Sequence, residues 1–444
     1  MLGRDEAERV LAQALAASRA EQTEALILAH DSSLTRFAEN AIHQNVSERD
    51  AVLRLRAVEG QRSGVATGND LSAEGIAALA ERALAIARLQ PPDPDFPGLP
   101  GPQQYARVHG YHESTAGCSP ERRARLAGAV CRRSAGMGLS AAGALETSVR
   151  EMAVANSHGL LGYHAYTMAE FTTVVMTGSS SGFGFALSGD VEELEVEQAG
   201  GRAIDKAIRG KNPRPLAEGS YTVVLEPEAT ADILGNMAYT SFGATAVEEG
   251  CSYLCGRFGS EVLSSEVTIC DDGLDGAGLP MPFDYEGVAR QRVTIIERGI
   301  AKGVVHDTYS AAKAATKSTG HALPAPNPRG PYPMHLVMEP GKRSPEELIA
   351  GVRRGLLVTR FHYTRIVHPL SVTVTGMTRD GTFRIENGEV AGPVRNLRFT
   401  QSYVEALRQP VVVGSDSRLC REYGRYRASA LRIPEFRFTG VTEF

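Results

Sequence analysis

Histidine and cysteine are the residue types in this sequence best suited to bind a metal ion. Cys251 and Cys255 form a CxxxC pair, which on a helix would place both thiols on one face. His362 and His368 lie six residues apart, so a strand would place both imidazoles on one face. Tetrahedral zinc needs more ligands than either pair offers, and no CxxC or HxxxH lies nearby. Buried structural cysteines and ordinary histidines are therefore the favoured interpretation.

The polar segment KSTGH (317–321) precedes the proline-rich stretch ALPAPNPRGPYP. Clustered polar groups beside a rigid loop suit contacts with a peptide, so Ser318, Thr319 and His321 are candidates for a substrate cleft. A plain surface loop explains the same residues equally well. The Ser- and Gly-rich segment 178–184 has neither GxxxxGK[ST] nor a GxGxxG that opens a helix, which argues against a nucleotide site. The many serines give no local triad signature of a serine hydrolase.

Hydrophobic periodicity predicts the helices and strands that would position these residues. Apolar residues at helical spacing predict helices over about 5–20, 72–88, 119–135 and 190–209, with Ser72 as an N-cap and Ser119-Pro120 as a favoured start. Apolar or alternating runs predict strands over about 25–30, 34–45, 51–60, 61–69, 139–155 and 160–177. A flexible loop is expected at 178–182. Glu59-Gly60 is a plausible hairpin turn.

The segment KNPRPLAEG (211–219) is the best candidate for a domain boundary. A chain of 444 residues is too long for one ordinary core, so two domains are expected. The helix and strand patterns predict that residues 1–212 form an N-terminal domain of mixed helices and antiparallel strands. Residues 218–444 predict a β-rich C-terminal domain, which opens with a strand and a helix from Pro227. The expected fold class is therefore α+β.

Composition excludes several classes of protein. Hydrophobic residues make up 42% and charged residues 22%, which is typical of a globular protein. A formal net charge of -5 provides no general attraction for nucleic acid or an anionic membrane, so neither is expected as a partner. No signal-peptide pattern and no stretch of about 20 apolar residues is present, which favours a cytoplasmic protein. The six scattered cysteines are expected to be reduced thiols.

Several segments, in order along the chain, resemble the TldD/PmbA (Tld) family of peptidase proteins. Near the N-terminus these are LTRFAENAIHQN and the hairpin VEGQRSGVATGNDLS. In the second half they are PFDYEGVARQRVTIIERGIAKGVVHD, KSTGHALPAP, MEPGKRSPEELIAGVRRGLLVT and GTFRIENGEVAGPVRNLRFT. The resemblance covers almost the whole chain. It implies mixed α/β architecture in the N-terminal half and a β-rich C-terminal half.

The resemblance also indicates which kind of subunit this is. TldD-type subunits of the family bind zinc through HExxxH on a helix and a C-terminal cysteine, with the glutamate as general base. No HExxxH or HExxH occurs here, and Gly235, Asn236 and Thr240 stand about where that motif would lie. Cys420 occupies roughly the place of the cysteine. The resemblance is therefore to the TldE (PmbA-type) subunit, which lacks the zinc ligands.

This resemblance implies a non-catalytic subunit that binds no cofactor itself. Zinc is expected in a TldD-type partner, and the heterodimer would enclose a cavity in which unfolded peptides are cut. A homodimer is possible when the chain is alone. Two alternatives stay open. One is an independent metallopeptidase with a divergent zinc site made of His362, His368 and Cys420. The other is a peptide-binding scaffold without a proteolytic partner.

Overall fold

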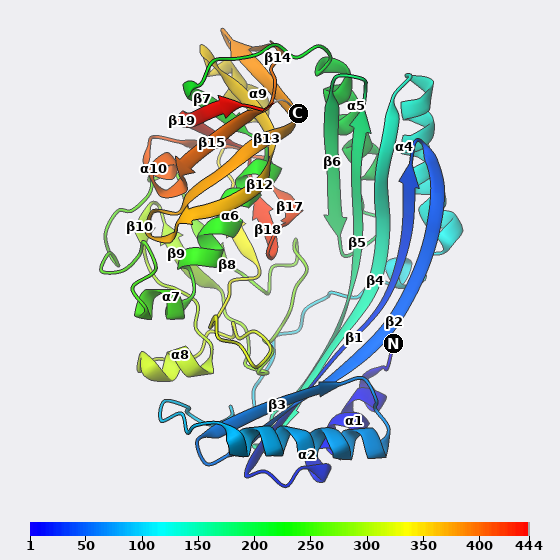
Figure 1. Ribbon diagram of the computed structural model, residues 1–444, viewed down its shortest axis with the longest axis vertical. Helices are drawn as coiled ribbons and strands as arrows, with labels where there is room; N and C mark the ends of the chain where they lie inside the picture. The colour runs from blue at the N-terminus through cyan, green and yellow to red at the C-terminus, as the bar shows by residue number, and fades with distance from the viewer. Residues whose placement is uncertain (443–444) are drawn as a thin grey trace.

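A long antiparallel sheet forms the framework of the N-terminal half. The computed structural model describes residues 1–442. The sheet has six strands in the order β3-β2-β1-β4-β5-β6. It is the long curved sheet on the right of Figure 1. The strands are β1 (Gln22–Ala38), β2 (Ala41–Glu59), β3 (Arg62–Gly68), β4 (Ser140–Asn156), β5 (Leu161–Met176) and β6 (Ser181–Ser188).

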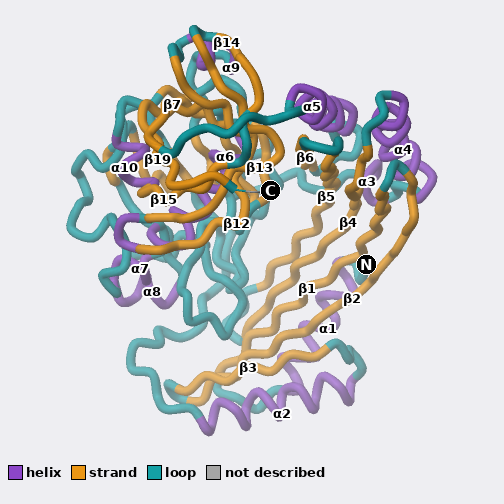
Figure 2. The backbone as a smooth tube through the Cα atoms, turned by 45° about the horizontal axis from the view of Figure 1, so that its top comes forward, coloured by secondary structure: helices purple, strands orange, loops and turns teal. Residues whose placement is uncertain are grey.

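Helices lie at the two ends of this sheet, with α1 and α2 at one end and α4 and α5 at the other (Figure 2). They are α1 (Arg4–Ala17), α2 (Ala73–Leu89), α3 (Glu113–Ala116), α4 (Pro120–Gly136) and α5 (Val196–Arg209). Ser72 and Ser119 accept hydrogen bonds from the N–H groups of Gly75 and Arg122, so the predicted N-cap at Ser72 and the predicted helix start at Ser119-Pro120 are confirmed.

The two faces of the long sheet contact different parts of the chain. Side chains alternate between the faces of a strand, and β1 pairs in register with both β2 and β4 over most of its length. In β1, in β4 and in β2 beyond its bulge at His43, odd-numbered residues therefore share one face and even-numbered residues the other. Leu53 and Ala153 belong to the core formed with α1 and α2. Met152, on the even face, belongs to a core with Phe283 of the C-terminal half.

The C-terminal half contains two further sheets. One has seven strands, in the order β12-β7-β19-β15-β13-β14 with β16 paired to β19. Its strands are β7 (Gly219–Leu225), β12 (Arg354–His368), β13 (Thr373–Glu386), β14 (Glu389–Pro393), β15 (Leu397–Ser402), β16 (Val412–Val413) and β19 (Leu431–Val441). The other has six, in the order β10-β9-β8-β11-β18-β17. They are β8 (Ile269–Asp271), β9 (Val293–Glu297), β10 (Ile300–Ala301), β11 (Leu336–Met338), β17 (Arg418–Arg421) and β18 (Arg425–Ala428).

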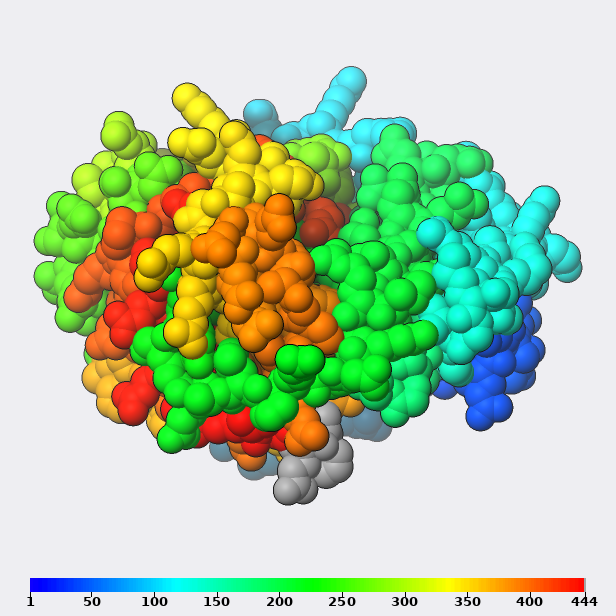
Figure 3. All heavy atoms as spheres, turned by 90° about the horizontal axis from the view of Figure 1, so that it is seen from above, coloured from blue at the N-terminus to red at the C-terminus, as the bar shows by residue number. Residues whose placement is uncertain are grey.

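Helix α6 lies at the centre of this half (Figure 1). It packs against β12 of the seven-stranded sheet and against β17 and β18 of the six-stranded sheet. The helical elements here are α6 (Pro227–Ser241), α7 (Ala244–Glu248), α8 (Thr308–Lys313), η1 (Pro369–Ser371), α9 (Pro345–Ala350) and α10 (Tyr403–Arg408). In the view from above, the green segment that includes α5 lies between the cyan N-terminal half and the orange and yellow C-terminal half (Figure 3).

The expected α+β class, with antiparallel sheets and a strand-rich second half, is confirmed. The prediction of one strand over 34–45 is wrong, because a turn at Glu39 and Asn40 separates β1 from β2. Both turn residues have positive φ, 50° and 65°, as a tight hairpin of this kind requires. The loop expected at 178–182 is shorter, since β6 begins at Ser181.

The assignment of residues 1–212 and 218–444 to separate domains remains a prediction. All six cysteines are free. Among the described residues, no helix is both long and apolar enough to cross a membrane.

Candidate functional site

Helix α6 holds Gly235, Asn236 and Thr240, the three residues that the family resemblance sets about where the zinc motif would lie, and each is engaged in packing. Asn236 donates its side-chain N–H to the Asp232 carbonyl oxygen at 2.9 Å and to its Oδ1 at 3.1 Å. The Thr240 hydroxyl donates to the Asn236 carbonyl oxygen at 2.9 Å. A Cβ atom added to Gly235 would lie 3.3 Å from the ring of Tyr423. The polar groups are thus satisfied within the helix, and a side chain at 235 would have to displace that ring.

The fold does not bring together the alternative metal ligands His362, His368 and Cys420 either. His362 is half-buried in β12, whereas His368 is exposed and its Nδ1 lies 3.0 Å from the Ser371 hydroxyl. Irregular pairing between His362 and Arg365 breaks the even spacing that would keep the two imidazoles on one face. Cys420 is buried in β17, and burial raises the pKa of its thiol well above the usual value.

A zinc ion does not fit the residues at this place. Zinc requires imidazoles, carboxylates or thiolates in a tetrahedral set. Gly235 offers no ligand, Asn236 and Thr240 hydrogen-bond within the helix, and Cys420 alone would be a single ligand. Residues 1–442 contain no group of three or more His, Cys, Asp or Glu side chains that could hold a metal ion.

A pair of carboxyl groups occupies the region instead. Asp232 accepts hydrogen bonds from the Thr364 hydroxyl at 2.7 Å and from the buried Tyr403 hydroxyl at 2.8 Å. These bonds tie α6 to β12 and α10. Burial raises the pKa of Asp232 to about 6. Glu422, in the β17–β18 turn, contacts solvent, yet the surrounding protein and the neighbouring Asp232 raise its pKa to about 8.

Two aromatic rings lie beside these carboxyl groups at the surface. The rings of Tyr239 and Tyr423 are 5.5 Å apart and 41% and 54% exposed. The Arg329 guanidinium lies 3.9 Å from the Tyr239 ring centre and donates to its hydroxyl at 2.8 Å. The surface next to α6 is therefore partly aromatic and partly charged, a composition that suits a protein or peptide contact.

The raised pKa values predict a pH dependence of stability. A carboxyl group whose folded-state pKa lies above its unfolded value, near 3.8 or 4.5, binds protons on folding. The contribution of Asp232 and Glu422 to stability therefore falls as pH rises from about 4 to about 8. Glu422→Gln removes one group and its repulsion of Asp232, so the variant should lose less thermal stability than wild type between pH 5 and pH 8. The surface substitution Glu266→Gln is the control. Equal losses for wild type and Glu422→Gln would contradict the coupling.

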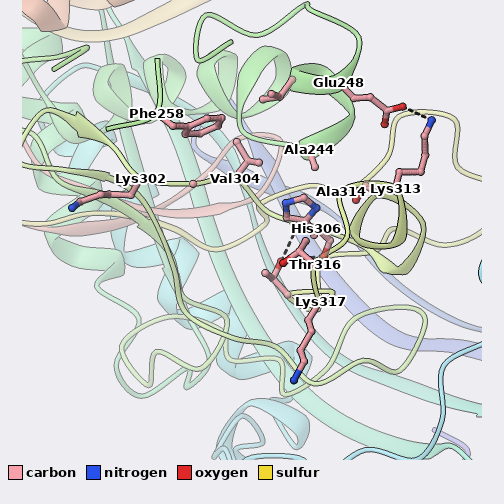
Figure 4. Close-up of a pocket in the computed structure, with 14 residues that line it drawn as sticks. Ala244, Glu248, Phe258, Lys302, Val304, His306, Lys313, Ala314, Thr316 and Lys317 are labelled. Carbon is pink, nitrogen blue, oxygen red and sulfur yellow. Dashed lines mark hydrogen bonds and ion pairs between the residues drawn. The ribbon is translucent and has the colours of Figure 1, made fainter. Parts of the chain in front are cut away.

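The segment 318–321 borders a separate pocket of about 640 Å³ in the C-terminal half (Figure 4). Thr319 lines this pocket, whereas Ser318 and His321 do not. The pocket is lined by Ala244, Val247, Glu248, Phe258, Lys302, Gly303, Val304, His306, Ser310, Lys313, Ala314, Thr316, Lys317 and Thr319. Apolar side chains and the His306 ring form much of its wall (Figure 4).

Thr319 is held at the pocket wall by the residues behind it. Its hydroxyl oxygen accepts the His306 backbone N–H at 2.8 Å and lies 2.9 Å from His321 Nδ1. His321 is fully buried, and its Nε2 lies 2.8 Å from Asp271 Oδ1. Since a carboxylate can only accept, Nε2 carries the proton and Nδ1 is an acceptor; the Thr319 hydroxyl faces this nitrogen and also lies 3.0 Å from the His306 carbonyl oxygen. Ser318 instead donates its hydroxyl to the His306 carbonyl at 3.2 Å.

Asp271 is the centre of this buried network. Its other oxygen accepts the His335 backbone N–H at 2.7 Å, and Arg290 Nη1 lies 3.9 Å from Oδ1. Burial opposes ionisation, yet contacts with His321, His335 and Arg290 lower the pKa of Asp271 to about 2. Burial also lowers the pKa of His321, so its imidazole is neutral near pH 7. The network fixes the position of Thr319 and keeps His321 away from any ligand in the pocket.

Sequence patterns did not point to Asp232, Glu422, Tyr403 or Asp271. One local signal existed, because Asp232 is a charged residue within the apolar helical run TADILGNMA. The contact partners lie far along the chain: Tyr403 is 171 residues from Asp232. No spacing rule connects residues at such separations.

Comparisons with known proteins cover nearly the whole chain. Three models of the PmbA/TldA metallopeptidase family match it: domain 1 over residues 24–87, the central domain over 119–211 and the C-terminal domain over 218–440. The chain is 25% identical over 407 residues to Metalloprotease PmbA of Escherichia coli O157:H7, covering 88% of this chain and 86% of that protein. A Metalloprotease of Methanothermobacter thermautotrophicus is 28% identical over 274 residues, which is 60% of each protein.

Solved structures share the fold. TldE from Thermococcus kodakarensis superposes with a TM-score of 0.88 at 23% identity, covering 98% of this chain and 99% of that one. A putative modulator of a DNA gyrase from Thermotoga maritima gives a TM-score of 0.86 at 20% identity, covering 97% and 100%.

Proposed function

Given that this chain belongs to the PmbA/TldA metallopeptidase family, we propose that it is the non-catalytic, TldE-like subunit of a Tld-type metallopeptidase. The observation that carries the proposal is the chemistry of α6. The residues that the resemblance sets about where the zinc motif would lie are Gly235, Asn236 and Thr240, and the last two hydrogen-bond within their own helix. The ring of Tyr423 occupies the space beside Gly235.

In this proposal the chain pairs in the cytoplasm with a TldD-type subunit that supplies zinc and the general base. Zinc in that partner would activate water for hydrolysis of an unfolded peptide. This chain contributes to holding the peptide. Thr319 and the pocket beside it are the proposed contact, because the pocket offers apolar wall and a hydroxyl fixed by His321 and Asp271.

Zinc content and partner dependence test the proposal together. Purified alone in chelator-free buffer, the protein should carry no stoichiometric zinc and cleave no unfolded peptide, because α6 offers no ligand set. Adding a TldD-type partner should produce turnover, and inactivating the HExxxH of that partner should abolish it. Metal analysis and peptide cleavage provide the two measurements.

The alternatives give different outcomes. About one zinc per chain, lost on His362→Ala, would favour an independent metallopeptidase with a divergent site. Peptide binding without turnover in the presence of every TldD-type partner would favour a scaffold. Neither result is compatible with the proposed non-catalytic subunit.

A further inference from the structure

Apolar side chains from three separate segments line the pocket beside Thr319. Val247 belongs to α7, Phe258 to the loop that follows it, and Val304 to the segment after β10. These three residues are called the apolar wall. Phe258 is 43% exposed, so much of its ring is uncovered. An open aromatic ring beside aliphatic groups is a surface that an apolar or aromatic side chain of a ligand can cover.

The hydroxyl groups of Ser310 and Thr319 in this pocket have little hydrogen-bonding capacity left for a ligand. The Ser310 hydroxyl donates to Asp307 Oδ1 at 2.7 Å and accepts the Asp307 backbone N–H at 3.2 Å. The Thr319 oxygen accepts the His306 backbone N–H at 2.8 Å, and its proton has the His306 carbonyl oxygen and His321 Nδ1 as acceptors. A polar side chain placed against these groups would lose hydrogen bonds to water without regaining them, which favours an apolar one.

The charged side chains around the pocket leave one cation unpaired. Glu248 and Lys313 form an ion pair, and Lys302 pairs with Glu297 at 2.8 Å. Lys317 has no ion-pair partner in residues 1–442. Its side chain extends away from the apolar wall, so an anion that it binds would lie at the rim of the pocket (Figure 4). A ligand that carries a carboxylate beside an apolar group would complement both features.

We propose that this pocket binds an aromatic side chain of the peptide, and that Lys317 binds a carboxylate next to that side chain. The ring lies against Phe258, where an aromatic pair gains attraction beyond the burial of its area. The carboxylate belongs either to an adjacent acidic residue or to the end of the peptide chain. This inference rests on the proposed function, because it takes the pocket as part of the peptide path, and it adds the class of peptide that the pocket selects.

Fluorescence anisotropy with short labelled peptides tests the aromatic specificity on the purified chain. An amidated Gly- and Ser-rich peptide with a central Phe-Asp pair should bind roughly 10- to 100-fold more tightly than its Ala-Asp counterpart, because an aromatic side chain is buried. It should bind about 2- to 10-fold more tightly than a Leu-Asp peptide. Phe258→Leu should remove the preference for Phe over Leu. The control Tyr363→Leu changes an exposed aromatic residue outside the pocket and should leave that preference unchanged.

The same assay tests the carboxylate. Replacing Asp by Asn in the Phe-Asp peptide should weaken binding about two- to fivefold, the range for an exposed ion pair. A peptide that ends in Phe with a free carboxylate, compared with its amide, measures the chain end as the other source. Lys317→Gln should abolish the larger of these two differences, which identifies the source. The control Lys211→Gln, at an exposed lysine of the N-terminal half, should keep it.

Equal binding of the Phe-Asp and Ala-Asp peptides, or no binding of either, would overturn the proposal. So would a wild type that ignores both carboxylates, or a carboxylate preference that survives Lys317→Gln. None of these measurements uses a TldD-type partner. Turnover with such a partner but no aromatic preference would remove this inference alone. Aromatic preference without turnover in the presence of every TldD-type partner would instead remove the proposed subunit role.

Discussion

Replacing Asp271 by alanine should lower the free energy of unfolding by about 3–5 kcal/mol, the range for breaking a buried ion pair by removing one partner. The side chains of Asp271 and Arg290 are both fully buried. Without the carboxylate, the Nε2–H of His321 and the backbone N–H of His335 lose their acceptor. The side-chain nitrogen atoms of Arg290 have no hydrogen-bond partner, and Asp271 is the carboxylate within 4 Å of them. The substitution therefore leaves the buried guanidinium without this counter-charge.

Urea unfolding at pH 7 measures this effect, with the surface substitution Glu266→Ala as control, expected within about 0.5 kcal/mol of wild type. The loss should depend on pH. The pKa of Asp271 in the folded protein is about 2, below its usual 3.8. Its ionisation therefore stabilises the fold above about pH 4, and that contribution disappears as pH falls towards 2. A loss below about 1 kcal/mol at pH 7 would contradict the central role given to Asp271.

Local sequence patterns predicted many helix starts and turns of the N-terminal half, because caps and turns depend on residues that are neighbours in the sequence. Ser72 and Ser119 precede α2 and α4 and cap them, as serine before an amphipathic run should. The turn at Glu59-Gly60 was also predicted, and Gly60 has the positive φ that glycine adopts without strain. The turn at Glu39 and Asn40 was not, because neither residue is glycine and the surrounding alternation continues through it.

The candidate site was only partly predictable because its contacts join distant segments. The motif comparison placed Gly235, Asn236 and Thr240, but nothing local indicated that Tyr423 fills the space beside Gly235. The segment 317–321 was singled out for its polarity, and Thr319 does line a pocket. The burial of His321 depends on Asp271, which lies 50 residues away. Polarity alone cannot distinguish a residue at a pocket wall from one buried behind it.

This distinction determines which substitutions can test peptide binding. His321→Ala would remove a fully buried partner of Asp271 and would chiefly measure folding. A substitution at the open wall of the pocket is more informative. Gly303 lines the pocket, and a Cβ atom added there would meet its nearest neighbour, the Thr294 carbonyl oxygen, at 3.7 Å, an ordinary contact distance.

Gly303→Phe should therefore be tolerated by the fold while its ring competes with a peptide for the pocket next to Phe258 and Val304. Burial of one apolar peptide side chain contributes about 1.5–3 kcal/mol. Losing it should reduce peptide turnover, measured with a TldD-type partner, by roughly 10- to 100-fold, since each 1.4 kcal/mol is a factor of ten. Thr319→Ala, which removes a single hydroxyl, should reduce turnover less.

The matched control is Gly101→Phe, because a Cβ atom there meets no other atom within 4 Å and Gly101 is exposed in a loop of the N-terminal half. Both variants should keep the wild-type midpoint of thermal unfolding and still assemble with the partner, so that a fall in turnover reports the pocket alone. If the pocket holds substrate, the loss should occur mainly as a higher KM, because a ground-state contact is being removed. Wild-type turnover in Gly303→Phe would exclude this pocket from the peptide path and leave the aromatic surface at Tyr239 and Tyr423 as the next place to test.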